Sequence, residues 1–475
     1  MIRKFYILLL LLPYIIFTYV GVSSASSYVF DHPDKLPYPT LKFSPLTAPR
    51  IALENGMILY VLEDHEIPLV KISAVIRTGS VHDPIGKEGL AELTGDVMRT
   101  GGTTSLSGTT IDETLEFSAC SLEISINRDL GSANLSVLKK NLEPALKILS
   151  DILQHPAFED DKLHLAKALK IEEIKRIADD PQKLAFREFN RFMYQNNPRG
   201  RLASISSVKK INRDDLLEFH KTFFYPANIM ISITGDITKA EAVNKMKKYF
   251  GHWKTAETGK PFIPLPEKQT GHIYFLEKDT PQSIIIHGNM APAKKDKDAY
   301  AFEVLDFMLG SGGFRSRIFR EIRSARGLSY STGSFYKVKS EYGIFGAYAI
   351  TGTESTTTVI SLIRSIIEDA KKNAIKKIEL DWAKKSINNS FIFSFRSVHQ
   401  IAVQQMMNEY EKLSEDYMAT FRDNIEKVQT FDVKNVAEKY LTLENAVVLV
   451  LGNEKTYQTL KSIFGTIMKV EATND

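Results

Sequence analysis

The chain has 475 residues, of which 43% are hydrophobic and 25% are charged, an ordinary composition for a globular protein. Its formal net charge of +4 is small for this length, and no dense basic block alternates with aromatic residues, so we exclude a nucleic-acid-binding protein. The single cysteine, Cys120, excludes an internal disulfide and a cysteine-based metal site.

Residues 1–25 predict a signal peptide. Arg3 and Lys4 precede an apolar run that gives way to small residues near Ala25, and this order is typical of secretory leaders. In a bacterium, cleavage of the leader would place the mature chain in the periplasm. The alternative is a retained membrane anchor, because the apolar run 5–22 is nearly long enough to span a bilayer.

Two folded segments follow the leader. Residues 26–48 are rich in proline and predict an extended segment. We predict a first domain over residues 49–254 and a second over residues 271–470. The intervening residues 255–270 contain three prolines, which restrict the backbone and predict an extended linker.

The two predicted domains share one order of elements. Each begins with two strands, continues with a helix that ends in glycines, and closes with a helix and an apolar strand that also ends in glycine. The closing glycines, Gly235 and Gly452, lie about 220 residues apart, as a duplicated domain requires. Long helices predicted at 160–178 and 355–374 alternate with strands. The predicted fold class is α+β, with two homologous halves, each an antiparallel-rich sheet with helices packed on one face.

Several stretches, taken in chain order, resemble the pitrilysin/insulinase family of zinc metallopeptidases, in the shorter branch that includes mitochondrial processing peptidase. The stretches are LENGMILYVLED, RTGSVHDPIGKEGLAEL, IEEIKRIADDPQKLAF, SGGFRSRIFREIRSARGLSYSTGS and the strands that end in glycine. The resemblance covers nearly all of the chain after the leader. It implies that each half is one half of a peptidase clamshell, and that the substrates are peptides or unfolded polypeptides.

The resemblance also implies a helix with the motif His-x-x-Glu-His, whose histidines bind zinc and whose glutamate is the general base. Those three positions fall on Glu92, Gly95 and Asp96. The distal zinc-ligand glutamate falls on Glu173, with Glu172 as the neighbouring alternative. Zinc favours imidazole or thiolate ligands, and glycine cannot deprotonate water. We therefore expect this chain to bind no zinc and to be inactive alone.

A carboxylate site for another metal is the alternative interpretation of this region. Oxygen ligands suit calcium or magnesium, and Glu92, Asp96 and Glu173 are the candidates. We prefer the interpretation that Glu92 and Asp96 lie on the wall of a partly solvated cavity and that Asp96 or Glu173 pairs with a nearby lysine or arginine.

The second half keeps a different family signature. The family's substrate-binding arginine and tyrosine fall on Arg323 and Tyr330. Both side chains can donate hydrogen bonds to a substrate carbonyl and stabilise the charge that develops on it during hydrolysis. A purely structural role for the pair is the alternative.

The family's peptide-binding edge strand falls on residues 118–129 of the first half. We expect Ala119, Cys120, Ser121 and Leu122 to accept extended peptide there through backbone hydrogen bonds, which do not read side chains. We interpret Cys120 as a small, buried apolar residue and not as a nucleophile.

We therefore predict an exported, non-catalytic subunit of a two-chain zinc peptidase. In this branch one chain can supply the zinc helix while a sister chain supplies the arginine and tyrosine; this chain has lost the first set and kept the second. The expected partners are a zinc-bearing homologous subunit and a peptide substrate. A peptide-binding or structural scaffold without hydrolytic activity is the alternative, and a peptidase with a rearranged metal site is a third hypothesis.

Overall fold

The computed structural model describes residues 46–254 and 262–473, and the chain from Ser44 to Asp475 forms one compact unit. The predicted signal peptide lies outside the described residues. Within the two described ranges, no helix is both long and apolar enough to cross a membrane.

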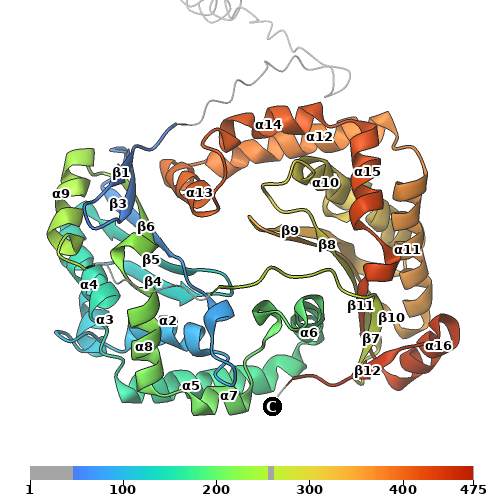
Figure 1. The fold of residues 1–475 in the computed structure, drawn as a ribbon, viewed down its shortest axis with the longest axis horizontal. Helices are drawn as coiled ribbons and strands as arrows, with labels where there is room; N and C mark the ends of the chain where they lie inside the picture. Colours follow the sequence, from blue (N-terminus) through green and yellow to red (C-terminus); the bar gives the residue numbers. More distant parts are fainter. Residues whose placement is uncertain (1–45, 255–261, 474–475) are drawn as a thin grey trace, which may run out of the picture. The chain divides into compact units, whose positions relative to one another are not determined.

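Two six-stranded mixed sheets organise this unit, and antiparallel pairs predominate in both (Figure 1). The first sheet has the order β1-β2-β6-β3-β5-β4, with β1 (Arg50–Ala52), β2 (Ile58–Glu63), β3 (Leu69–Ile76), β4 (Ser121–Ile126), β5 (Gly131–Leu138) and β6 (Ile229–Gly235). The second sheet has the order β12-β7-β11-β8-β10-β9, with β7 (His272–Glu277), β8 (Gln282–Ala291), β9 (Ser329–Val338), β10 (Gly343–Gly352), β11 (Val447–Gly452) and β12 (Met468–Val470).

Five strands of each sheet repeat one topology, which confirms the predicted α+β fold; the sixth is antiparallel β1 in the first sheet and parallel β12 in the second. In each, a parallel pair of strands ends at a glycine: Gly235 lies opposite Glu63, and Gly452 lies opposite Glu277. Gly235 has a φ of 112°, and a Cβ added there would lie 2.0 Å from the carbonyl oxygen of Leu69. Only glycine combines this backbone conformation with so close an approach.

Helices of each half pack on one face of that half's sheet, as predicted. The helices of the first half are α2 (Leu90–Thr100), α3 (Gly108–Phe117), α4 (Leu142–Gln154), α5 (Asp160–Arg176), α7 (Ile205–Lys210), α8 (Arg213–Phe223) and α9 (Lys239–Phe250). Those of the second half are α10 (Ala299–Asp306), α11 (Thr356–Lys372), α12 (Lys377–Ile392), α14 (Tyr417–Lys427), α15 (Thr430–Tyr440) and α16 (Glu454–Phe464). Each set encloses its own apolar core.

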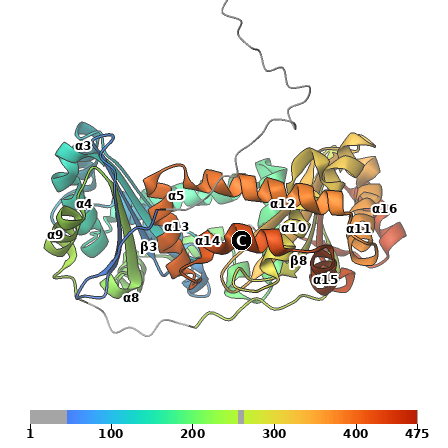
Figure 2. The same ribbon diagram turned by 90° about the horizontal axis from the view of Figure 1, so that it is seen from above.

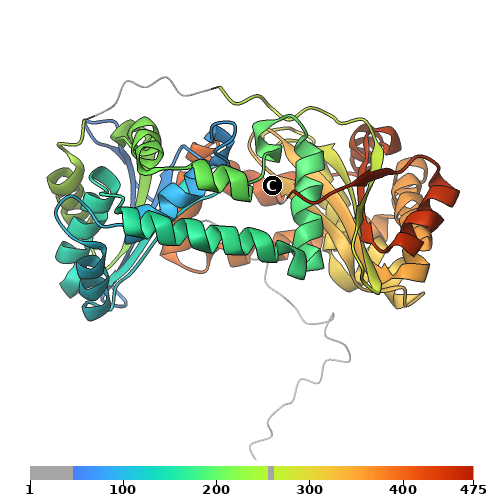
Figure 3. The same cartoon turned by 90° about the horizontal axis from the view of Figure 1, so that it is seen from below.

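Two further helices are exchanged between the halves. Helix α6 (Pro181–Tyr194) follows α5 in the sequence but packs against β8 and β11 of the second sheet (Figure 3). Helix α13 (Val398–Tyr410) follows α12 but packs against β2 and β6 of the first sheet (Figure 2). Each sheet is therefore covered on both faces, whereas the sequence predicted helices on one.

Candidate functional site

Helix α2 carries the positions expected for the zinc motif, and a carboxylate from the preceding loop holds its first turn. The Asp83 carboxylate accepts hydrogen bonds from the backbone N–H groups of Gly89 and Ala91, each at 2.8 Å. These N–H groups have no acceptor within the helix itself. The start of α2 is thus fixed in place although the motif's histidines are missing from its sequence.

Gly95, at the position of the family's catalytic glutamate, lies where α2 crosses β4. A Cβ added to Gly95 would lie 3.0 Å from the backbone nitrogen of Ile126 and 3.2 Å from its Cγ1. These distances are shorter than ordinary van der Waals contacts. Glycine therefore permits this close approach of helix and strand, and any larger residue requires one of them to move.

A lysine ammonium lies between two of the carboxylates assigned to the zinc-site positions. Lys170 Nζ donates hydrogen bonds to Glu92 Oε1 at 2.7 Å and to Glu173 Oε2 at 3.0 Å. The Lys170 side chain is only 12% exposed. Burial by itself lowers the pKa of Lys170, but the two carboxylates outweigh burial and raise the pKa above its usual value. The ammonium therefore stays charged at neutral pH.

Glu173, and not its neighbour Glu172, shares this lysine. Glu172 instead pairs with Lys175 at 2.8 Å, and both of those side chains are about half exposed. Glu173 thus has the kind of basic partner that we expected for Asp96 or Glu173, Lys170 supplies the charge, and its pairing with Glu92 was not predicted.

Asp96 lines a cavity of about 400 Å³, together with Glu92, Lys170 and Glu173. The pKa of Asp96 is raised to about 6, although the residue still reaches solvent. Partial loss of hydration is the larger cause, and the negative charge of Glu92 is the smaller one. In residues 46–254 and 262–473, no group of three or more histidine, cysteine, aspartate or glutamate side chains is arranged to hold a metal. The residues here do not fit zinc, because imidazole is missing and an ammonium lies between the carboxylates.

Arg323 and Tyr330 lie together on the second half. Arg323 belongs to a short π-helical segment, η10 (Phe319–Ser324), and Tyr330 is the second residue of β9. The Arg323 guanidinium lies 4.2 Å from the centre of the Tyr330 ring and 4.8 Å from that of Phe319, and its Nη1 donates to the Tyr330 carbonyl oxygen at 3.0 Å. The Tyr330 side chain is 82% exposed. The pair is therefore held by these contacts, with Tyr330 exposed and Arg323 partly exposed.

Strand β4 is an edge strand of the first sheet, and its outer side pairs with no other strand among the described residues. It pairs with β5 from Ser121 to Ile126 only, so it is shorter than the predicted segment 118–129. Of the four residues assigned to peptide binding, Ser121 and Leu122 lie in the strand.

Ala119 and Cys120 lie before the strand, which corrects the sequence-based assignment. Ala119 has a φ of 46°, and its N–H donates to Glu116 at the end of α3, while the Cys120 N–H donates to Leu115. Their backbone groups thus close the turn after the helix. Burial raises the pKa of the Cys120 thiol to about 11, so it stays protonated, as expected of a packing residue.

The sequence interpretation missed Lys170, although part of the signal was present. Lys170 lies three residues before Glu173, a spacing that places both side chains on one face of a helix. Its second partner, Glu92, lies on another helix and is 78 residues away in the sequence. That contact depends on the packing of α5 against α2 and could not be inferred from spacing.

The chain duplicates one α+β unit. Its first half has an altered zinc helix, and its second half has an arginine–tyrosine pair. This combination is that of a homologue of two-domain zinc peptidases. Two family models match the chain: one described as Insulinase (Peptidase family M16) over residues 59–204, and one described as Peptidase M16 inactive domain over residues 210–387. The chain belongs to the insulinase family of peptidases, M16, as a member without the His-x-x-Glu-His motif.

Individual relatives agree with this assignment. An uncharacterized zinc protease of Rickettsia bellii is 24% identical over 368 residues, covering 77% of this chain and 86% of the relative. A protein of Helicobacter pylori named non-peptidase homolog YmxG is 24% identical over 431 residues, covering 87% and 96%. The crystal structure of a peptidase M16 inactive domain from Pseudomonas fluorescens has a TM-score of 0.78 at 23% identity, covering 86% of this chain and 98% of that one.

Proposed function

We propose that this chain is an exported, non-catalytic subunit of a two-chain zinc peptidase, and that it contributes Arg323 and Tyr330 to a site whose zinc is held by a homologous partner. The substrates are peptides or unfolded polypeptides. The observation that carries the proposal is the contrast between the two halves: the first half holds a lysine where a metal is expected, and the second presents an exposed and ordered arginine–tyrosine pair.

The first half supports a role without hydrolysis of its own. Zinc-dependent hydrolysis requires a metal-bound water and a general base. Lys170 already pairs with both Glu92 and Glu173, and Gly95 offers no base. A peptide can still be held at the outer edge of β4, because backbone pairing there needs no catalytic side chain.

The second half supports a role in binding a reacting carbonyl. A guanidinium has five N–H donors, of which Arg323 spends one on the Tyr330 carbonyl oxygen. The ring contacts with Tyr330 and Phe319 limit the motion of the guanidinium. Donors that are oriented before the reaction need little reorganisation when negative charge develops on a substrate oxygen.

The proposed export depends on the order of basic, apolar and small residues in the leader. An extracytoplasmic subunit of this kind would act on polypeptides outside the cytoplasm. Amino-terminal sequencing of the mature protein checks this part: we expect the chain to start near Ser26, and an intact Met1 in the membrane fraction would favour the retained anchor.

The test of the proposed role uses the complex of this chain with the proposed zinc-bearing homologue, which would be isolated through an affinity tag on this chain. Arg323→Ala and Tyr330→Phe should each lower peptide turnover by about 10²–10³-fold, the typical effect of removing one oriented donor. Assembly and zinc content of the complex should stay unchanged. Arg396→Ala is the matched control, because Arg396 also lies over an aromatic ring, that of Phe393 at 5.1 Å, and it is exposed, whereas Arg323 is partly exposed.

Two outcomes would reject this role. Full turnover in both intact variant complexes would favour a peptide-binding or structural scaffold, the alternative that the name of the Helicobacter pylori relative also suggests. Loss of assembly in both variants would show that the pair braces the fold. Size measurement and zinc analysis of each complex distinguish these results from a loss of catalysis.

A further inference from the structure

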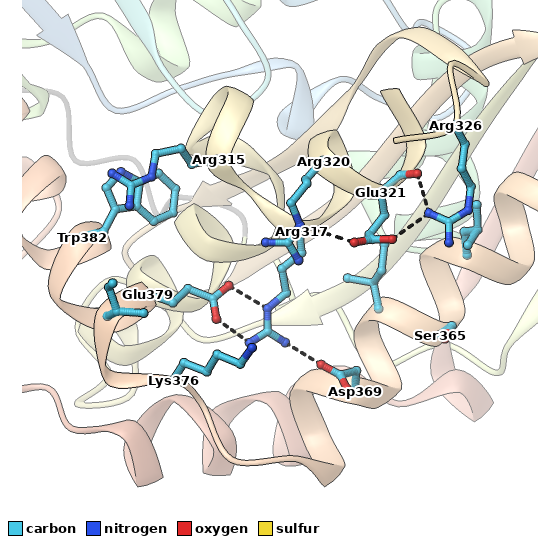
Figure 4. A pocket seen from close by; sticks show the side chains of 13 residues that line it. Arg315, Arg317, Arg320, Glu321, Arg326, Ser365, Asp369, Lys376, Glu379 and Trp382 are labelled. Carbon is cyan, nitrogen blue, oxygen red and sulfur yellow. Dashed lines mark hydrogen bonds and ion pairs between the residues drawn. The ribbon is translucent and has the colours of Figure 1, made fainter. Parts of the chain in front are cut away.

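A second polar cavity lies in the second half, between residues 313–326 and the helices α11 and α12 (Figure 4). Its volume is about 570 Å³. Five basic and three acidic side chains line it, so its net charge is +2. Arg323 and Tyr330 do not line this cavity, and nothing in the proposed function depends on it.

One of the arginines is fully neutralised and has a structural role. The Arg317 side chain is only 10% exposed. It donates two hydrogen bonds to Glu379, both at 2.7 Å, and a third to Asp369 at 3.0 Å (Figure 4). Such a two-pronged contact is the strongest form of arginine–carboxylate pairing. Arg317 thus ties its segment to α11 and α12 and forms one wall of the cavity.

A second carboxylate is shared by two further arginines. Glu321 accepts from Arg326 at 2.6 Å and from Arg320 at 3.3 Å. The Arg320 contact is the longer one, and the Arg320 side chain is 56% exposed. Glu321 therefore neutralises at most one of these two positive charges.

The remaining two cations have no carboxylate partner in the part of the chain that the structure describes. The Arg315 guanidinium lies 5.0 Å from the ring centre of Trp382, a cation–π contact that leaves its N–H donors available (Figure 4). Lys376, just before α12, is exposed on the same cavity. Next to them, Ile378 is 74% exposed. The cavity thus combines unpaired positive charge with apolar surface.

We propose that this cavity binds an acidic peptide segment, with carboxylates at Arg315 and Lys376 and an apolar side chain against Ile378 and Trp382. The charge calls for an anionic ligand, and the apolar surface calls for more than an inorganic anion. Figure 4 shows the Arg315 guanidinium beside Trp382 and the Lys376 side chain apart from it, beyond Glu379, so the two free cations do not point at one position. A segment of acidic and apolar residues in a partner protein or substrate satisfies both features.

The test uses the full chain with Trp253→Phe, which leaves Trp382 as the only tryptophan. The probes are a short synthetic peptide of glutamate and aspartate with one leucine, the same peptide with glutamine and asparagine, and inorganic phosphate. Tryptophan fluorescence reports binding near Trp382, and calorimetry measures affinity independently. We expect saturable binding of the acidic peptide that weakens as salt rises.

The variant with both Arg315→Glu and Lys376→Glu should bind the acidic peptide about tenfold more weakly or worse. Lys455→Glu is the control, because Lys455 is an exposed lysine on α16 that does not line the cavity; its effect should stay below about twofold. No binding of the acidic peptide, equal binding of the neutral peptide, or unchanged affinity in the double variant would overturn the proposal. Displacement of the peptide by phosphate with equal affinity would also overturn it, in favour of a small-anion site.

Discussion

Among single residues, Lys170 stabilises a cluster of acidic side chains on the packed helices α2 and α5. Glu92 and Glu173 lie close enough to share one ammonium, so without it their negative charges would repel each other. Asp96 adds a third carboxylate to the same cavity. The raised pKa of Asp96 shows that the surroundings already disfavour additional negative charge.

Lys170→Met should lower the free energy of unfolding by about 1–2 kcal/mol at pH 8, less than for a fully buried pair because Glu92 and Glu173 remain partly exposed. The loss should shrink near pH 4.5, below the raised pKa of Asp96 of about 6, because protonated Asp96 no longer adds a negative charge to the cavity. Urea unfolding at both pH values measures this. Lys175→Met is the control: it breaks an exposed pair on the same helix and should cost less than about 0.5 kcal/mol. Equal losses for both variants would contradict the role given to Lys170.

Glu173 and Gly95 show how much of the altered zinc site could be predicted from the sequence. Motif spacing left Glu172 and Glu173 as alternatives. The choice matters because a shift of one residue turns a side chain by about 100° around a helix. The packing of α5 against α2 decides between them. Gly95 could be recognised as a lost base, but its close approach to Ile126 depends on how α2 crosses β4.

Among the elements, helix α13 contacts the first sheet through a half-buried histidine, His399. His399 Nδ1 lies 2.9 Å from Thr234 Oγ1 on β6, and Nε2 lies 3.3 Å from Ser73 Oγ on β3. Burial, with a smaller contribution from the charge of Lys71, lowers the pKa of His399. The folded protein therefore favours the neutral imidazole at this contact.

The pKa shift of His399 has a defined consequence for stability. An unfolded histidine takes up a proton near pH 6.5, whereas folded His399 resists protonation. The stabilisation that His399 gives to the folded state is therefore present above about pH 6.5 and is lost as the pH falls. His399→Gln keeps hydrogen-bonding groups but does not titrate. Its melting temperature should therefore fall less than that of the wild type between pH 7.5 and pH 5.5.

His65→Gln is a control of opposite sign. Asp236 and then Glu63 raise the pKa of His65, so its contribution is present below the unfolded pKa and is lost as the pH rises. Without His65, acidification should lower the melting temperature more than in the wild type. If His399→Gln follows the wild-type pH profile, His399 does not control the docking of α13.

The strands and most helices could be predicted from the sequence, but the exchange of α6 and α13 could not. Strand β11 is apolar at every position before its closing glycine, the pattern of a strand buried on both faces, whereas β6 also contains Ser232 and Thr234. That pattern indicates that something covers the second face. It does not identify the covering helix, since α6 and α13 each follow a helix of their own half in the sequence and reach the opposite sheet through tertiary packing alone.

For the molecule as a whole, this exchange makes the two halves depend on each other. Helix α6 places Leu184, Phe189 and Met193 in the core on the second sheet, and α13 places Ala402 and Met406 in the core on the first. Burying a large apolar side chain contributes about 1.5–3 kcal/mol. Separation of the halves would expose both sets of side chains and the sheet faces beneath them.

A chain cut between the halves should therefore stay together. We would insert a protease site between Lys254 and Phe262 and cleave the folded protein. The cleaved protein should elute in native buffer at the size of the intact chain and unfold in one cooperative transition, because α6 and α13 still cover the opposite sheets. Each half produced alone should bind a hydrophobic dye and aggregate, and co-production should restore the intact size. Two separate species after cleavage, each with its own cooperative unfolding transition, would show that the exchanged helices do not hold the halves together.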